Sequence, residues 1–119
     1  MEKLYNTEAI LKTHGGDMEF VKYIAGLFVE HVPEMSSELQ KASAKKDWAS
    51  LYFYAHKMKA SIDLFNITSL ADVIRKLEKQ GKTESISDTL KKDVKYVAAI
   101  IDACVIQLKS DFEITDLVN

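Results

Sequence analysis

The sequence predicts an all-α fold, an antiparallel four-helix bundle with an additional short N-terminal helix. Three observations predict it. Apolar residues recur at spacings of three and four along four long segments. No stretch of useful length alternates apolar and polar residues as a half-buried strand does. One proline and four glycines in 119 residues disfavour a turn-rich β architecture. Because the connections between the helical segments are short, consecutive helices are expected to be antiparallel.

Capping residues and glycines delimit the first two helices. Thr7 is a candidate N-cap of a short helix that ends near Lys12, where residues 14–16 (His-Gly-Gly) stop it. Asp17 is the expected N-cap of the next helix. The apolar stripe of that helix consists of Phe20, Ile24, Leu27, Phe28, Val32 and Met35. Since Pro33 interrupts the stripe, we expect either a kink there or a break followed by a second helix.

The central helix is expected to run from its N-cap, Asp47, to about Phe65. Asn66 tolerates the left-handed conformation and can end it. At about 100° per residue, one side of this helix collects a core stripe of Leu51, Ala55, Met58 and Ile62, flanked by Trp48 and Phe65.

Two further helices follow. Thr68 or Ser69 begins the first of them, and Gly81 is expected just past its last turn. Residues 82–88 are polar and form the best candidate loop. A long last helix then carries Val94, Val97, Ile101, Val105 and Leu108 on one face. The tail from about Asp111 has no clear period, and we expect it to fray.

Length and composition indicate one helical domain covering residues 1–119. The net charge is −2 and no basic block exceeds two residues, which disfavours nucleic acid as a partner. No apolar run is long enough to span a bilayer and no signal peptide opens the chain, so no membrane partner is expected. The single cysteine, Cys104, is expected to be buried in a reducing compartment, which favours the cytoplasm.

The outer face of the central helix is unusual for a solvated surface. His56 lies about 120° from the centre of the core stripe and is therefore expected at the solvent boundary or beyond it. Its helical neighbours include small and aromatic residues in place of long charged ones. We expect the following residues to bind a partner: Ala49, Tyr52, Phe53, Lys57, Ala60 and Asp63.

An exposed imidazole of this kind can carry a phosphoryl group. Its reference pKa of about 6.5 leaves a nucleophilic nitrogen available near neutral pH, and this nitrogen can attack an acyl phosphate. Lys59 lies at i+3, within reach of the same space, and its ammonium would offset the charge of the arriving phosphoryl group. A simple alternative is that His56 is an ordinary boundary residue and that Tyr52 and Phe53 cover a helix crossing.

The other candidate sites are weak. His14 beside two glycines is expected to be a loop residue, and His31 to pair with a carboxylate near a helix end. The three histidines lack metal-ligand spacing, so no metal or other cofactor is expected. There is no glycine-rich phosphate loop and no paired carboxylate in an apolar context, so an enzyme with its own substrate pocket is not expected.

Residues 55–61, Ala-His-Lys-Met-Lys-Ala-Ser, resemble the phosphoacceptor motif of histidine-containing phosphotransfer (HPt) domains of multistep two-component phosphorelays. The family pattern is Ala-His-x-Leu-Lys-Gly-Ser/Ala, followed by a glycine and by a helix ending Leu-Glu-x-x-Gly. This chain has Leu-Glu-Lys-Gln-Gly at residues 77–81, and Gly16-Asp17 and Asp47 also look like the family. The resemblance is strong from Asp47 to Gly81 and looser elsewhere.

The resemblance implies a four-helix bundle in which His56 is the phosphorylated histidine and Lys59 assists the phosphoryl group. Such a monomer accepts phosphate from the aspartate of a receiver domain and delivers it to another receiver. The partners would be the receiver domains of response regulators and hybrid histidine kinases, and the Mg²⁺ of the exchange would sit in the receiver. Two positions depart from the pattern, because Ala60 and Asn66 stand where the family has glycine.

Two other functions stay open at this point. The chain could be a docking module that binds a receiver or kinase without transfer, with Ala60 as the departure that favours it. It could also be a structural protein that self-associates through the face of Tyr52 and Phe53.

Overall fold

The computed structural model describes residues 2–115, and its regular structure is entirely helical within that range. The helices, in chain order, are α1 (Glu8–Thr13), α2 (Met18–Lys45), α3 (Trp48–Leu64), α4 (Thr68–Thr83) and α5 (Leu90–Asp111). The predicted all-α class and the short N-terminal helix are confirmed.

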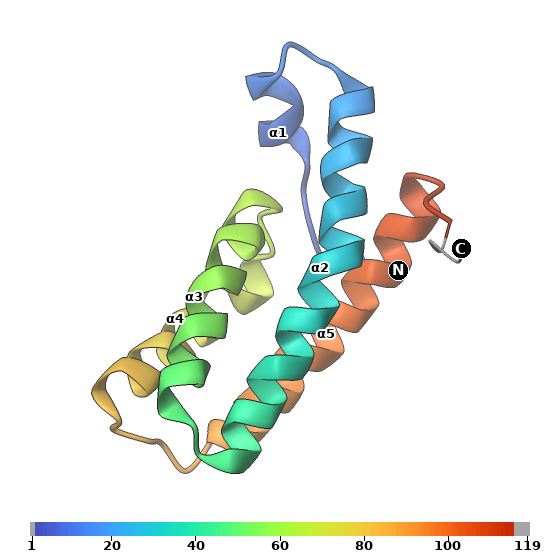
Figure 1. Cartoon of the computed structure of the whole chain (residues 1–119). Helices are drawn as coiled ribbons and strands as arrows, with labels where there is room; N and C mark the ends of the chain where they lie inside the picture. Colours follow the sequence, from blue (N-terminus) through green and yellow to red (C-terminus); the bar gives the residue numbers. More distant parts are fainter. Residues whose placement is uncertain (1, 116–119) are drawn as a thin grey trace.

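The four long helices reverse direction from one to the next, as Figure 1 shows. α2 packs against α3 and α5, α4 packs against the same two helices, and α1 lies against α2. α2 extends beyond the α3–α4 pair at the end of the molecule where α1 lies (Figure 1).

The predicted caps hold in most cases. The Asp17 carboxylate accepts from the backbone N–H groups of residues 19 and 20, and Asp47 accepts from Ser50 N. Asn66 has φ 50° and closes α3, as expected. Thr7 is the exception, because its side chain makes no capping bond. The carboxamide of Asn6 accepts from the Glu8 N–H instead, at 2.8 Å.

Two helix boundaries differ from the prediction. Of the two alternatives at Pro33, a kink or a break followed by a second helix, the break is wrong, since α2 continues through Pro33 to Lys45. A proline costs one backbone hydrogen bond there, and the buried residues on either side, Val32 and Leu39, keep their core contacts. Gly81 was expected beyond α4 but lies inside it, and the helix ends at Thr83 with Glu84 in the left-handed conformation.

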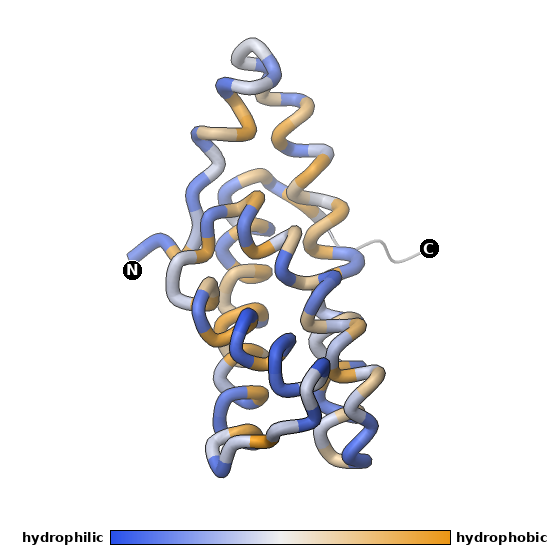
Figure 2. The backbone as a smooth tube through the Cα atoms, turned by 90° about the vertical axis from the view of Figure 1, so that its left-hand side faces the viewer, coloured by the Kyte–Doolittle hydropathy of each residue, from blue (hydrophilic) through white to orange (hydrophobic). Residues whose placement is uncertain are grey.

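The predicted core stripes of α3 and α5 agree with the structure, whereas in the predicted α2 stripe only Phe28 and Val32 are buried and the other four residues are partly exposed. The stripe residues of α3, Leu51, Ala55, Met58 and Ile62, are fully buried, and so are most of the α5 stripe residues. Figure 2 shows the resulting alternation of hydrophobic and hydrophilic segments along the helices. Cys104 is buried as expected, and burial raises the pKa of its thiol to about 11. None of the described helices is long and apolar enough to cross a bilayer.

The segment before α1 is held against the end of α3 and against α5. Asn6 N donates to Phe65 O at 2.8 Å, and Leu4 N donates to the side chain of Gln107 at 3.0 Å. Asp111 accepts from Lys3 and Tyr5. α5 ends at Asp111, where the irregular tail was expected to begin, and residues 116–119 of that tail lie outside the described part of the chain.

Candidate functional site

The site begins with the position of His56 on α3. The Asp47 cap fixes where α3 starts, and the fully buried stripe fixes which side of it faces the core. His56 is then directed outward, and 57% of its side chain is exposed. The predicted position of the imidazole at the surface is confirmed.

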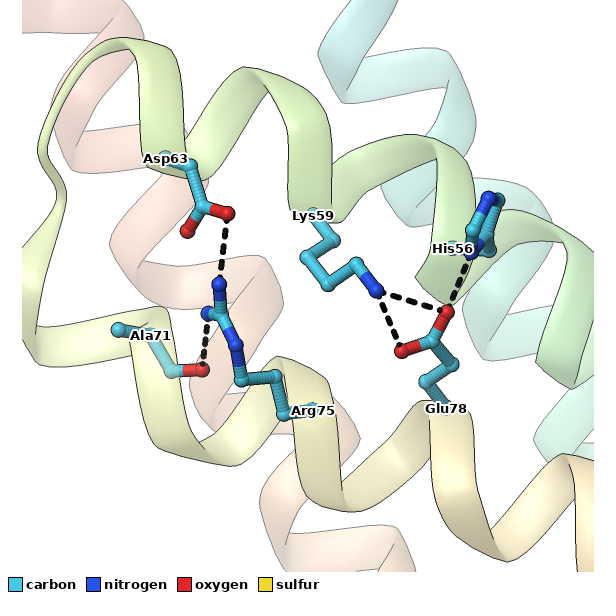
Figure 3. A network of polar contacts seen from close by, with 6 residues as sticks. All are labelled: His56, Lys59, Asp63, Ala71, Arg75 and Glu78. Carbon is cyan, nitrogen blue, oxygen red and sulfur yellow. Dashed lines mark hydrogen bonds and ion pairs between the residues drawn. The ribbon is translucent and has the colours of Figure 1, made fainter.

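A glutamate from the neighbouring helix holds this ring. Glu78 of α4 places its carboxylate between the His56 ring and the Lys59 ammonium (Figure 3). Its Oε2 contacts His56 Nδ1, while Lys59 Nζ donates to Oε1 at 2.9 Å and to Oε2 at 3.2 Å. The Glu78 side chain is 15% exposed, so its contacts with Lys59 are partly shielded from water, whereas its contact with His56 lies at the surface.

The ionisation state of Glu78 decides the tautomer of His56. The pKa of Glu78 is lowered, first by the hydrogen bond from Lys59 and also by that from His56, and burial opposes the shift only in part. The carboxylate is therefore ionised at neutral pH and can only accept hydrogen bonds. His56 Nδ1 must donate, so in the neutral ring the proton is on Nδ1 and the lone pair is on Nε2. Figure 3 shows this second nitrogen on the side of the ring away from Glu78.

Tyr52 stacks on the imidazole from one turn earlier in α3. The two ring centroids are 5.7 Å apart and the rings are inclined by 27°. Tyr52 is half-buried, which agrees in part with the simple alternative that this side chain covers a helix crossing. The stack restricts the ring from one side, and the Glu78 contact restricts it from another.

Most of the predicted partner-binding residues lie on the surface. Ala49, Lys57 and Ala60 are exposed, and Phe53 is 50% exposed with Lys57 Nζ 5.2 Å from its ring centroid. Asp63 is also exposed, but its carboxylate accepts from Arg75 of α4 at 2.6 Å. The structure therefore brings together small, aromatic and charged side chains beside His56.

The remaining histidines are separate from this site. His14 caps the end of α1, and its ring lies against Phe20 with a centroid distance of 3.9 Å. His31 Nε2 lies 3.9 Å from a Glu30 carboxylate oxygen, the expected pairing, although inside α2 and not at a helix end. Among residues 2–115, no cluster of three or more potential metal ligands occurs.

The His56 side chain is open to solvent. A groove of about 530 Å³ does exist between α2 and α5, lined by residues such as Tyr23, Leu27 and Ile114. None of its lining residues belongs to α3 or α4. The groove is therefore separate from His56, Lys59 and Glu78.

Sequence reasoning missed Glu78 and Arg75 as members of the site. Glu78 stands in the Leu-Glu-x-x-Gly stretch, but its contact with His56 depends on how α4 is aligned along α3. The signal that could have found it is the short turn between the two helices, which limits the residues that can face each other. Comparisons of the chain with protein-family models, with curated proteins and with solved structures gave no match.

Proposed function

We propose that this protein is a phosphorelay intermediate that accepts a phosphoryl group on Nε2 of His56 from a receiver-domain aspartate and passes it to another receiver domain. In this proposal the four long helices constitute the antiparallel four-helix bundle of the HPt domains that residues 47–81 resemble. The protein is a phosphocarrier without substrate turnover of its own, and it acts as a cytoplasmic monomer.

One observation carries the proposal, namely that His56 is exposed while its Nδ1 is held by Glu78. An imidazole that only filled a boundary position would not need a charged partner from a second helix. The contact leaves Nε2 as the nucleophile and directs it away from the protein. Both features suit transfer from a donor that is itself carried on a protein surface.

The transfer step follows from this arrangement. The lone pair of Nε2 attacks the phosphorus of the aspartyl phosphate, the N–P bond forms, and the P–O bond to the aspartate breaks and releases a carboxylate. The proton stays on Nδ1, where the Glu78 carboxylate stabilises the positive charge that develops on the ring. In the forward delivery the ring leaves as a neutral imidazole, because Nδ1 has kept its proton throughout.

Lys59 and the small residues complete the site. The Lys59 ammonium is 29% exposed, so it can turn from Glu78 toward the phosphoryl oxygens while the ring is loaded. Ala60 and Ala49 are exposed and add little bulk beside the ring, which leaves a path for the receiver. The Mg²⁺ expected for the exchange belongs to the receiver.

The test is phosphotransfer profiling. Receiver domains of the source organism are loaded at their aspartates with radiolabelled acetyl phosphate and mixed with the protein. We expect acid-labile label on the wild type and on His31→Gln, whose histidine is similarly exposed, and no label on His56→Gln. Equal labelling of His56→Gln would refute the proposal. Stable complexes without label would instead indicate a docking module, and a concentration-dependent dimer in sedimentation would indicate self-association.

A further inference from the structure

We propose that Gly81 is a positioning residue, which sets the separation of α3 and α4 at which Glu78 can hold the His56 ring. The consequence for transfer rests on the proposed function. The geometric part, the hold of Glu78 on the ring, can be tested without any transfer.

The space around Gly81 admits no side chain. A Cβ atom built on Gly81 would lie 2.6 Å from Tyr52 N, 2.9 Å from Trp48 O and 2.9 Å from Tyr52 Cα. All three atoms belong to the backbone of α3, so no side-chain rotation can relieve the contact. The backbones of α3 and α4 therefore approach each other here as closely as a glycine permits.

This contact lies one helical turn from the site. Gly81 follows Glu78 by three residues on α4, and Tyr52 precedes His56 by four residues on α3. The Tyr52 backbone that meets Gly81 also carries the ring that stacks on His56. A change in helix separation at Gly81 is consequently transmitted over one turn to the Glu78–His56 contact.

The required displacement is large on the scale of a hydrogen bond. Moving the Cβ of an alanine from 2.6 Å to the 3.4 Å of an ordinary contact needs an opening of about 0.8 Å. The Lys59 side chain is flexible enough to follow Glu78. The His56 ring is joined to its backbone by only two rotatable bonds and is stacked on Tyr52, so it cannot follow Glu78. The contact that the opening breaks is therefore the one between Glu78 and His56.

Gly26 offers a matched control. It also lies inside a long helix, α2, but a Cβ built there meets no atom within 4 Å. Gly26→Ala therefore tests the general effect of replacing a helical glycine by alanine, which is expected to favour the helix. Only Gly81→Ala tests the close approach of α3 and α4.

The experiment compares Gly81→Ala, Gly26→Ala and wild type by ¹⁵N NMR of the imidazole nitrogens and by phosphorylation with potassium phosphoramidate, from which Nε2 displaces ammonia. For Gly81→Ala we expect His56 to lose its preference for the Nδ1–H tautomer, the pKa of Glu78 to rise toward 4.5, and labelling to slow about tenfold. The signals of His31 should stay as in wild type, and so should the His56 tautomer and the labelling rate of Gly26→Ala. A folded Gly81→Ala that keeps the wild-type tautomer would overturn the inference.

A second variant decides the question if Gly81→Ala does not fold. Glu78→Asp leaves the contact of α3 with α4 intact and shortens the carboxylate by one methylene, about 1.5 Å. If the separation is matched to glutamate, this variant folds and loses the tautomer preference. If His56 in Glu78→Asp kept its preference for the Nδ1–H tautomer, the contact would tolerate a shorter side chain. The separation of α3 and α4 would then not need to be matched to glutamate, and the role of Gly81 would be overturned. Should wild-type His56 take no phosphoryl group at all while Gly81→Ala still loses the tautomer, the proposed function fails and the positioning role stands.

Discussion

Replacing Glu78 with glutamine should destabilise the protein in a way that depends on pH. The variant keeps the size of the side chain and removes the charge that Lys59 and His56 share. Exposed ion pairs contribute about 0.2–1 kcal/mol, and removing one partner of a buried pair costs about 3–5 kcal/mol. Because the side chains of Lys59 and Glu78 are 29% and 15% exposed, we expect a loss between these two ranges, about 1–2 kcal/mol at neutral pH.

The sign of the pH dependence follows from the lowered pKa of Glu78. The folded state binds the proton on Glu78 more weakly than the unfolded chain does, so this group stabilises the fold above the unfolded value of 4.5. The contribution disappears as the pH falls through the lower, folded pKa. The difference between wild type and Glu78→Gln should therefore be full at neutral pH and shrink below 4.5.

Urea denaturation at steps between about pH 7 and about pH 3 measures this difference directly. Glu34→Gln is the matched control, since Glu34 is exposed on α2 and should change stability by less than about 0.5 kcal/mol. Other carboxylates also lose stabilisation in acid, but they do so equally in wild type and variant. A loss for Glu78→Gln that stays constant down to the lowest pH would refute the ion-pair reasoning.

Two further substitutions separate access to the site from folding. Ala60→Arg fills the space beside the imidazole from an exposed position, so transfer from a loaded receiver should be blocked while stability changes by less than about 0.5 kcal/mol. The control is the same substitution at the exposed Ala99 of α5, which should leave transfer intact. A large loss of stability for Ala60→Arg would contradict the exposed placement of Ala60. Met58→Asp puts a charge into a fully buried position of the α3 stripe. It should lower the free energy of unfolding by more than about 4 kcal/mol, enough to abolish the cooperative thermal transition in circular dichroism. A variant that melts like wild type would show that this face of α3 does not belong to the core.

The features that the sequence predicted well are local ones. The caps at Asp17 and Asp47 act on backbone groups two or three residues away, and the left-handed Asn66 acts on its own peptide. The stripe of α3 depends only on the 3.6-residue period, which is why the outward position of His56 followed from the sequence. Each of these needs information from a single helix.

The features that were missed depend on a second helix. A break was one of the two expectations at Pro33 because the local cost of a helical proline is known, whereas the packing of α2 on α3 and α5 is not visible from the local sequence. Gly81 looked like a terminus for the same reason. Its actual role, a close approach to the backbone of Tyr52, involves a residue 29 positions earlier in the chain.

The Glu78–His56 contact could nevertheless have been narrowed down from the turn between α3 and α4. Asn66 closes α3 and Thr68 begins α4, so the two helices are joined almost without a loop and run antiparallel. In such a hairpin, residues at similar distances on either side of the turn lie opposite each other. His56 lies ten residues before Asn66 and Glu78 twelve after it. The turn thus limits the partner of His56 to a few residues of α4, but choosing Glu78 among them requires the axial register of the helices, and the close contact at Gly81 is where that register becomes fixed.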